Sequence, residues 1–453
     1  MATAAPAAGQ PSLPLREHVG RTLKLAGPVM ASRAGLLVMT SVDTIMCGRA
    51  GAEELAYYGI SLAPSLSFML VGIGLMMGVV VLTAQTDGAG RPHECGRIWR
   101  LGLINGLIAG GLFGLAMLPG ESLLLLLGQN PEISRGGGEA LRMFAFGMPA
   151  ILAYTSTTLF LEGIGRSTPG MVVMIAANLV NLALNWVLMF GPFEMGATGA
   201  VLATSITRWF MFAAIAGYVL LMVGRDDYGV FAPMRGAWGF ERKLARLGWP
   251  LAISFLMEHG AFFAAATFAG WLGQIPLAGY QVTLNVMALI YMLAIGLSTA
   301  TGVRVGNAVG RLDREGLARA GWVGLGIGVL IMLALTPVLW FAAPWIVAIY
   351  TDDPAVAAVA IPGLGIAAWI LVVDASQGIM VGALRGAADI WVTMGLQAIA
   401  FWVIGIPLCY WLGHVQGFGV AGLLWGLFAA LLASAVFLTG RFQVISRRDV
   451  RPF

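Results

Sequence analysis

The chain has 453 residues, of which 59% are apolar and only 11% are charged, with a formal net charge of +4 and a mean hydropathy of +0.85. Soluble domains carry about 25% charged residues, so this composition excludes a soluble protein and predicts an all-α integral membrane protein. At about 20 apolar residues per crossing, the length allows about a dozen helices and excludes a sizeable water-soluble or catalytic domain.

The first 24 residues (1–24) are expected to form a cytoplasmic N-terminal segment. Their beginning is rich in alanine and proline, and the first long apolar run starts only after Arg16, Arg21 and Lys24. This order differs from the basic, apolar and small-residue regions of a cleavable signal peptide. We therefore interpret the first apolar run as a transmembrane span.

Apolar runs between clusters of charge predict twelve transmembrane helices. An even number of spans places both ends of the chain on one side of the membrane. The predicted spans cover residues 25–47, 57–84, 98–118, 140–163, 169–190, 197–223, 247–271, 279–303, 320–342, 356–384, 391–412 and 418–440.

The basic residues are distributed unevenly between the loops. Alternating the loops between two sides leaves only Arg49, Arg135 and Arg142 opposite the termini, with Arg33 and Arg208 inside spans and every other arginine and lysine on the side of the termini. Because basic loops stay in the cytoplasm, we expect both termini to be cytoplasmic. This topology explains the basic balance without nucleic acid as a partner.

The longest cytoplasmic connection divides the chain into two halves of six spans. We predict an N-lobe at residues 25–223, an inter-lobe loop at 224–246, a C-lobe at 247–440 and a cytoplasmic tail at 441–453. The two lobes are expected to enclose a central cavity.

The halves also match each other in sequence when one is shifted by about 222 residues. The matches include Pro28 with Pro250, Gly48 with Gly270, Gly51 with Gly273 and, at an offset larger by one, Gly196 with Gly419. A near-constant offset over several helices predicts a duplicated six-helix unit. Because six is even, both copies enter the membrane from the same side, as in transporters built from parallel repeats.

Three acids lie inside predicted spans. Asp43 is near the outer end of the first span, and Glu258 and Asp374 are in the middle of the seventh and tenth. A carboxylate at this depth costs several kcal/mol and usually faces an ion, a proton or a substrate. One alternative is neutralisation by an arginine, for which Arg33 is the candidate in the first span. The functional interpretation is a site that takes up a proton or binds a hard cation through carboxylate and neutral oxygens.

Aromatic and amide side chains lie near Glu258 and Asp374, the two acids of the predicted C-lobe. Phe262 lies one turn after Glu258 on the same helix face, and Tyr291 in the next span offers a second ring, so a cation could meet ring faces as well as charge. Ordinary aromatic packing is an equally good interpretation of both rings. Gln377, three residues after Asp374, supplies a neutral oxygen beside that acid.

The first half carries a polar stripe of its own. Asn178, Asn181 and Asn185 share one face of the fifth span, and Thr204 in the sixth could point toward them. Such amides often only join membrane helices. Both interpretations, interhelical contact and binding surface, remain open.

Other chemistry is not indicated. The three cysteines Cys47, Cys95 and Cys409 have no metal-binding spacing and are expected to be small core residues. No HExxH, GxSxG or Walker-type loop occurs, so we expect neither an enzyme nor a cofactor, and no direct use of ATP. Glu162 and Arg166 are expected to form a local structural pair.

Several short motifs occur in the order and spacing of a known family. They are Val-Asp-Thr-Ile-Met-Cys-Gly-Arg around Asp43, the surroundings of Glu258, Gly-Ala-Leu-Arg-Gly after Asp374, and Asn181-x-x-x-Asn185-Trp before a Gly-x-x-Gly-Ala loop. Together with twelve spans in two repeats, they resemble the multidrug and toxic compound extrusion (MATE) family, most closely its NorM-type bacterial branch. The resemblance covers nearly the whole chain after the first twenty or so residues.

The resemblance implies a bacterial inner-membrane antiporter that exports cationic amphipathic drugs and dyes in exchange for Na+ or H+, by alternating access. It implies that Glu258 and Asp374 bind the coupling cation, with Na+ as the bound metal if sodium couples transport, and that Phe262 and Tyr291 lie nearby. Asp43 is implicated in coupling or in substrate binding. We expect the protein to act as a monomer in the lipid bilayer.

The resemblance also extends to drug contacts, for which Gln281, Asp352 and Asp353 are further candidates beside the polar stripe. One departure matters: proton-coupled members of another branch carry an aspartate at the position of Asn185, which favours the second-half site here. A lipid or polysaccharide flippase of the related superfamily is the main alternative, but it would need a strongly basic cavity, and only Arg33 and Arg208 lie deep in spans. A channel or a membrane scaffold fits the buried acids less well.

Overall fold

The computed structural model describes residues 15–221, 223, 228–234 and 237–450. Within these residues, twelve helices are long and apolar enough to cross a membrane, and no residue forms a strand. The all-α fold with twelve spans is therefore confirmed. Helices suit this environment because a helix satisfies its own backbone hydrogen bonds where no water is present.

The first six spans form one set of packed helices. They are α1 (Leu15–Ala50), α2 and α3 in one span (Ala52–Met76 and Gly78–Gly88), α4 (Cys95–Met117), α6 (Pro131–Gly163), α7 (Thr168–Asn185) and α8 (Gly196–Leu221). A 3-10 turn, η1 (Pro92–Glu94), precedes α4, the short helix α5 (Gly120–Leu126) follows it, and α7 ends in a π-helical turn, η2 (Trp186–Phe190).

The last six spans form the second set. They are α9 (Ala237–Trp271), α10 (Gln274–Gly310), α11 (Arg314–Tyr350), α12 (Pro354–Gly386), a span made of α13 (Ile390–Ala398) and α14 (Ile406–Tyr410), and α15 (Gly419–Arg447). Two π-helical segments, η4 (Ile399–Gly405) and η5 (Trp411–Val415), follow α13 and α14.

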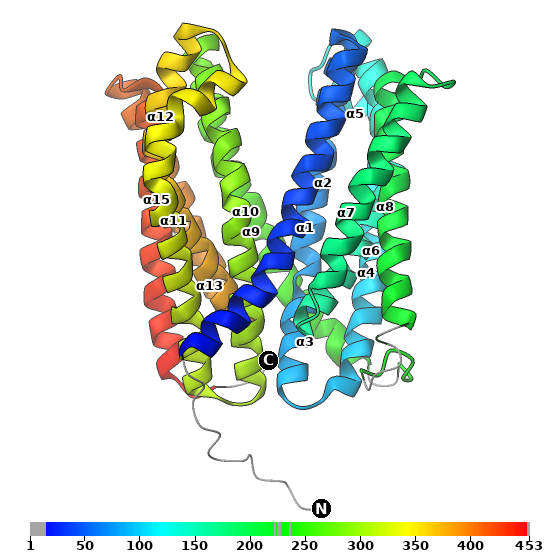
Figure 1. Cartoon of the computed structure of the whole chain (residues 1–453), viewed down its shortest axis with the longest axis vertical. Coiled ribbons are helices and arrows are strands. Elements are labelled where there is room, and N and C mark those ends of the chain that lie inside the picture. Colours follow the sequence, from blue (N-terminus) through cyan, green and yellow to red (C-terminus); the bar gives the residue numbers. More distant parts are fainter. Residues whose placement is uncertain (1–14, 222, 224–227, 235–236, 451–453) are drawn as a thin grey trace, which may run out of the picture.

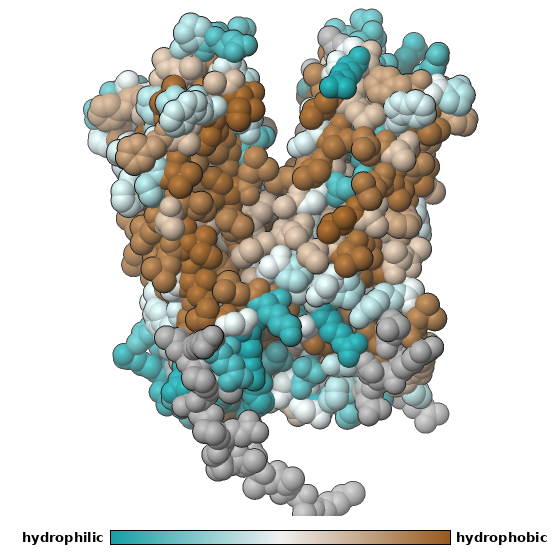
Figure 2. All heavy atoms as spheres, in the orientation of Figure 1, coloured by the Kyte–Doolittle hydropathy of each residue, from teal (hydrophilic) through white to brown (hydrophobic). Residues whose placement is uncertain are grey.

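The two sets stand as two lobes that meet near the end where α1 begins and α15 ends, and diverge toward the opposite end (Figure 1). We call them the N-lobe (α1–α8) and the C-lobe (α9–α15). The first turns of α1 cross from the N-lobe to the C-lobe, where Arg304 of α10 donates a hydrogen bond to the hydroxyl of Thr22. The space-filling view shows the molecule hollowed between the lobes on the side away from the termini (Figure 2).

Close backbone contacts seal the other side, where α2 and α3 pack against α9 and α10. A Cβ atom at Gly74 would lie 2.5 Å from the Cα of Ala252, and one at Gly310 would lie 2.1 Å from the carbonyl oxygen of Gln85. Gln85 also donates from Nε2 to the carbonyl oxygen of Gly386 at 2.9 Å, which links α3 to α12. Only glycine permits backbones to approach this closely.

The internal repeat is visible in the turns. Gly51 and Gly273 precede α2 and α10 with φ values of 149° and 120°, a conformation that favours glycine. Asn130 and Asp353 cap α6 and α12, and each accepts a hydrogen bond from the second residue of its helix, with proline at the first position. The residues that begin corresponding helices therefore have the same backbone conformation and the same capping hydrogen bond in both lobes.

Several helices extend beyond the predicted spans. Parts of the predicted N-terminal segment, inter-lobe loop and tail are helical, because α1 begins at Leu15, α9 at Ala237 and α15 ends only at Arg447. Hydropathy marks only the apolar part of a helix, whereas charged turns continue it into the headgroup and water layers. Residues 1–14, 224–227, 235–236 and 451–453 of these three segments lie outside the described residues.

Apolar packing accounts for the core of each lobe. One cluster of buried side chains extends through the N-lobe and the lobe contact, and another occupies the outer part of the C-lobe. Cys47 and Cys95 belong to the first cluster and Cys409 to the second, and all three are buried free thiols. Their prediction as core residues is confirmed.

Candidate functional site

A closed polar network surrounds Asp43 inside the N-lobe. Asn185 of α7 donates from Nδ2 to Asp43 Oδ1 at 2.6 Å, and the Thr204 hydroxyl of α8 donates to Asp43 Oδ2 at 2.6 Å. Asn181 donates to the Thr204 oxygen at 3.1 Å and accepts from Asn185 at 3.3 Å. We call these four residues the Asp43 network. Each is buried, and both Asp43 oxygens have a donor.

A buried arginine stands beside this network. Arg208 lies one turn after Thr204 on α8 and interacts electrostatically with Asp43, while its guanidinium lies 5.2 Å from the centroid of the Phe144 ring. Its Nη1 atom has no hydrogen-bond partner among the described residues. The charge that offsets Asp43 therefore comes from Arg208 on α8, and not from Arg33 on its own helix.

Asn178 lies outside the Asp43 network, although it shares the predicted stripe. Its Nδ2 atom donates to the carbonyl oxygens of Gly35 at 3.1 Å and Met174 at 2.9 Å. The first bond joins α7 to α1, and the second stays within α7. Asn178 thus makes the interhelical contact, while Asn181 and Asn185 reach the acid.

A different arrangement surrounds Glu258 and Asp374 in the C-lobe, which we call the carboxylate pair. The two acids come from α9 and α12. The charge of Glu258 acts on Asp374, and Arg385 of α12 acts on Glu258 with the opposite charge. Gln377 donates from Nε2 to Glu258 Oε1 at 3.1 Å, and its side chain also interacts with the carboxylate of Asp374. Asp374 is buried, and its Oδ1 atom has no partner among the described residues.

Two residues missed by the sequence interpretation complete this cluster. The Ser434 hydroxyl of α15 donates to Gln377 Oε1 at 3.2 Å, and Gln397 of α13 donates from Nε2 to the same oxygen at 3.5 Å. Both side chains are buried. Each is a polar residue in an otherwise apolar span. This pattern could have identified Gln397 in particular as a candidate site residue.

Both predicted rings lie in the C-lobe core, and Tyr291 also reaches the acids. Its hydroxyl approaches α12 at Gly378, where an added Cβ would lie 2.7 Å from it, and it interacts electrostatically with Asp374 and Glu258. Phe262 packs against the apolar C-lobe cluster. Of the two rings, Tyr291 is the one whose hydroxyl lies against α12 and interacts electrostatically with the acids.

The carboxylate pair has the chemistry of a small cation site. Two acids, an unpaired buried oxygen and a nearby hydroxyl are hard oxygen donors, which suit Na+ or a proton. The described residues contain no cluster of three or more His, Cys, Asp or Glu side chains that could hold a metal ion. Two carboxylates with few other oxygen ligands fit a weakly held monovalent cation or a proton better than a strongly bound divalent metal.

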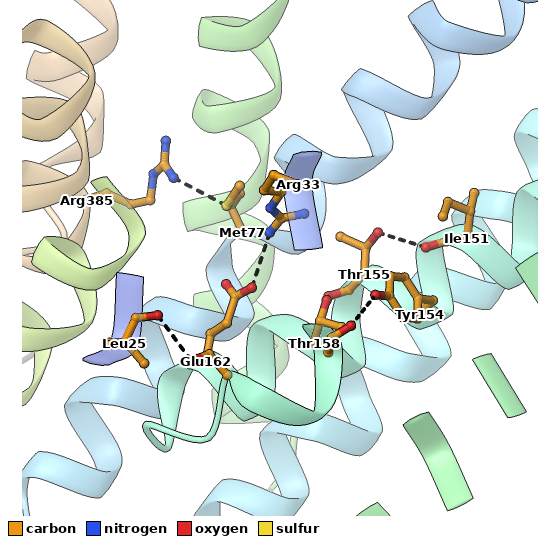
Figure 3. Close-up of polar contacts among 11 residues, drawn as sticks. Leu25, Arg33, Met77, Ile151, Tyr154, Thr155, Thr158, Glu162 and Arg385 are labelled. Atoms are coloured by element: carbon orange, nitrogen blue, oxygen red, sulfur yellow. Dashed lines mark hydrogen bonds and ion pairs between the residues drawn. The ribbon is translucent and has the colours of Figure 1, made fainter. Parts of the chain in front are cut away.

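A fourth acid, Glu162 in the last turn of α6, faces Arg33 of α1 (Figure 3). Glu162 forms an ion pair with Arg33 of α1, with 3.4 Å between Arg33 Nη2 and Glu162 Oε1. The predicted local pair of Glu162 with Arg166 is therefore wrong. Helix α6 ends at Gly163 and the chain turns at Gly165 (φ 76°), so Arg166 leaves the helix face that carries Glu162, whereas Arg33 of α1 lies against Glu162. Arg385, counted from sequence as a loop charge, is half-buried in the last turn of α12 and contacts the Met77 sulfur and the Phe255 ring.

The proposed outer drug contacts lie apart from both clusters. Gln281 is exposed on α10, and Asp352 is exposed in the turn between α11 and α12. Asp353 caps α12 by accepting from the backbone nitrogen of Ala355 at 2.8 Å. The position of Asp353 therefore has a structural explanation that requires no drug.

Comparison with known proteins gives the family. The MatE family model matches residues 28–187 and 250–411, and these two segments begin at Pro28 and Pro250, the first pair aligned by the repeat. The chain belongs to the MATE family.

Relatives place this MATE chain in the NorM-type branch. It is 35% identical to the "Probable multidrug resistance protein NorM" of Caulobacter vibrioides over 97% of the chain and 94% of that relative. It is 33% identical to the "Multidrug resistance protein NorM" of Burkholderia vietnamiensis over 97% and 96% of the two chains. The predicted family and branch are confirmed.

Solved MATE structures share the fold. The eukaryotic MATE transporter AtDTX14 superposes with a TM-score of 0.87 at 17% identity, covering 96% of this chain and 98% of that one. A multidrug resistance MATE transporter in its outward-facing conformation gives a TM-score of 0.88 at 20% identity, covering 95% and 97%. The two-lobed arrangement of this MATE protein is therefore that of the family.

Proposed function

We propose that this MATE protein is a multidrug efflux antiporter that exports cationic amphipathic compounds in exchange for Na+ or H+. The carboxylate pair carries this proposal, because Asp374 leaves a buried oxygen unpaired next to a second acid. Two neighbouring carboxylates repel each other unless a cation or a proton lies between them. A site of this kind changes its occupancy easily.

The cleft supplies the surface for the exported compound. Figure 2 shows largely apolar walls on the two lobes, which suit an amphipathic molecule, while its positive charge is drawn to ionised acids. Uptake of the coupling cation removes negative charge from the carboxylate pair. The ion and the drug therefore compete, and loading of the ion favours release of the drug on the open side.

The orientation in the membrane follows from charge. Figure 2 shows hydrophilic residues gathered at the end where the lobes meet. Among the described residues, most arginines predicted to be cytoplasmic lie in the helix ends and connections at that end, while Arg385 lies inside α12. Under the positive-inside rule, both termini are cytoplasmic, and in a bacterial inner membrane the cleft opens away from the cytoplasm. The structure then represents the state from which a drug leaves and an ion enters.

The test removes each acid of the pair in turn. Glu258→Gln and Asp374→Asn, made separately, should each abolish energised efflux of ethidium from loaded cells while the protein level in the membrane stays normal. Glu315→Gln is the matched control, because Glu315 is exposed and pairs only with Arg319 on its own helix. Normal efflux by both single variants would show that the pair is not the coupling site.

The identity of the ion requires a second experiment. Purified protein in liposomes is given an inward Na+ gradient at equal pH, and then a pH gradient without Na+. Dye movement under only one gradient identifies the coupling ion. If neither gradient moves the dye, antiport itself is contradicted.

A lipid or polysaccharide flippase fits the structure less well. Arg33 is paired with Glu162, and Arg208 lies beside Phe144 and Asp43. Arg385 of α12 lies against Met77 and Phe255 and interacts electrostatically with Glu258. A pyrophosphate-linked substrate needs several arginines directed into the cavity. The acids of the C-lobe would repel such a substrate.

A further inference from the structure

The amide of Gln377 connects the carboxylate pair to two residues on more distant helices. Its nitrogen donates to Glu258 Oε1, and its oxygen accepts from both Ser434 and Gln397. Gln377, Gln397 and Ser434 have exposed fractions of 1%, 1% and 0%, so water does not compete for these bonds. One continuous chain of hydrogen bonds thus runs from Glu258 on α9 through α12 to α13.

The direction of this chain depends on the charge of Glu258. An ionised carboxylate only accepts hydrogen bonds, so it requires the NH2 end of Gln377. A protonated Glu258, or a cation bound to it, requires an oxygen instead. With the Gln377 amide turned, its nitrogen would point at Gln397, which must then present its own oxygen.

Gln397 is equipped for the second arrangement. Its Oε1 atom is buried and has no partner among the described residues, while its Nε2 atom donates to Gln377. Turning both amides together gives the Gln397 oxygen a donor and presents the Gln377 oxygen to the acid. Ser434 fits both arrangements, because a hydroxyl donates or accepts as required.

We propose that Gln377 and Gln397 form an amide relay that reverses its hydrogen-bond direction when Glu258 takes up the coupling ion. Gln397 is a positioning residue that acts through Gln377, and in the direction seen here it favours the ion-free site. Ser434 supports both directions equally. This inference rests on the proposed role of Glu258 as an ion-binding acid.

Gln397→Glu keeps the approximate size of the side chain and replaces the amide donor by an ionised carboxylate, which only accepts hydrogen bonds. The ion-free direction then loses a bond, while the reversed direction keeps its acceptor at position 397 and Ser434 still supports either direction. We expect the concentration of coupling ion at half-maximal dye release to fall about fivefold, the equivalent of one net hydrogen bond, with the maximal rate unchanged. Ser434→Ala is the matched variant and should shift that concentration by less than about twofold, because it weakens both directions.

The readouts are ion-driven ethidium release from liposomes and the ion concentration that half-saturates the rise in melting temperature of the purified protein. The second readout requires no transport. Gln397→Asp, which also only accepts hydrogen bonds, provides a second variant if Gln397→Glu does not fold, and it should also lower the half-saturating concentration. Gln397→Leu removes the donor and the acceptor together, so it weakens both directions and should shift that concentration by less than about twofold. An unchanged or raised concentration in the acidic Gln397 variant, or an equal shift in Ser434→Ala or Gln397→Leu, overturns the relay.

Failure of the relay is distinguishable from failure of the proposed function. If Glu258→Gln abolishes ion-driven release and Gln397→Glu leaves half-saturation unchanged, only the relay is wrong. If Glu258→Gln leaves both release and ion-induced stabilisation unchanged, the ion site is wrong and the relay falls with it.

Discussion

In the N-lobe both oxygens of Asp43 accept hydrogen bonds of 2.6 Å and a buried arginine offsets the charge, whereas in the C-lobe Asp374 has an unpaired oxygen beside a second acid. The first carboxylate is satisfied by the protein itself. The second is satisfied only when something else arrives. The difference teaches that burial of an acid is not enough to make a loadable site, because the neighbouring donors decide whether an incoming ion gains anything.

The two clusters also do not occupy equivalent places in the repeat. Under the offset of 222 residues, Glu258 corresponds to Leu36, seven positions before Asp43 on α1. At 1.5 Å per residue, the acids differ in depth by about 10 Å. Duplication therefore supplied the helices and turns of both lobes, and the acids were placed separately within them.

The sharpest test of this comparison is the stability of two single variants. Asp43→Asn leaves the buried Arg208 without the negative charge that it interacts with, and we expect a loss of about 2 kcal/mol, less than for a buried pair in direct contact. Asp374→Asn removes one of two neighbouring acids and should leave the melting temperature in detergent unchanged or higher. The measurement is thermal unfolding of both proteins under the same conditions.

A double variant controls for the assignment of Arg208. Adding Arg208→Met to Asp43→Asn removes both charges and should recover most of the lost stability. If Asp43→Asn and Asp374→Asn lower the melting temperature equally, the two clusters do not differ in the way described.

The ion pair of Arg33 and Glu162 provides a second test, because Glu162 has a basic partner in the protein, as Asp43 does, while its Oε2 atom has no partner among the described residues. The side chains of Arg33 and Glu162 are 13% and 6% exposed. Glu162→Gln should therefore destabilise by about 2 kcal/mol through the unpaired buried arginine. Glu315→Gln, which breaks an exposed pair with Arg319, should change stability by less than about 0.5 kcal/mol. Equal effects in thermal unfolding would mean that Arg33 is solvated and that Glu162 is not held as described.

The sequence predicts the spans and the acids well because both signals are local. An apolar run of sufficient length forms a span wherever it occurs, and Asp43, Glu258 and Asp374 are visible as charges within such runs. The i, i+4 spacing of Asn181 and Asn185 likewise places them on one helix face.

The partners of these residues are set by packing between helices that are distant in sequence. Glu162 lies four residues before Arg166, yet it pairs with Arg33 of α1, 129 positions away. Gln397 and Ser434 reach Gln377 only through the rotation of α13 and α15 against α12. No pattern along the chain encodes these rotations, so the relay requires the structure.

A smaller effect tests the closure of the Asp43 network. Thr204→Val removes the donor to Asp43 Oδ2 and the acceptor for Asn181 in one step. We expect a loss of about 1 kcal/mol for each of these hydrogen bonds, seen as a lower melting temperature. Thr336→Val is the matched control, because the Thr336 hydroxyl bonds only to backbone carbonyl oxygens. A similar loss in both variants would indicate that Thr204 contributes packing alone.

The smallest expected effect concerns the ring of the C-lobe cluster and separates ion loading from folding. A methyl group at Gly378 would lie 2.7 Å from the Tyr291 hydroxyl, so Gly378→Ala should push the ring away from the carboxylate pair. A ring face near a cation contributes about 0.5–1 kcal/mol, and the half-saturating ion concentration should therefore rise about threefold. Gly395→Ala is the control, because an added Cβ there meets nothing within 4 Å.

Gly378→Ala should leave the Asp43 network untouched, since α12 and Tyr291 belong to the other lobe. A rise in half-saturation without a matching fall in melting temperature would locate ion binding at the carboxylate pair, and an unchanged value would remove Tyr291 from the site.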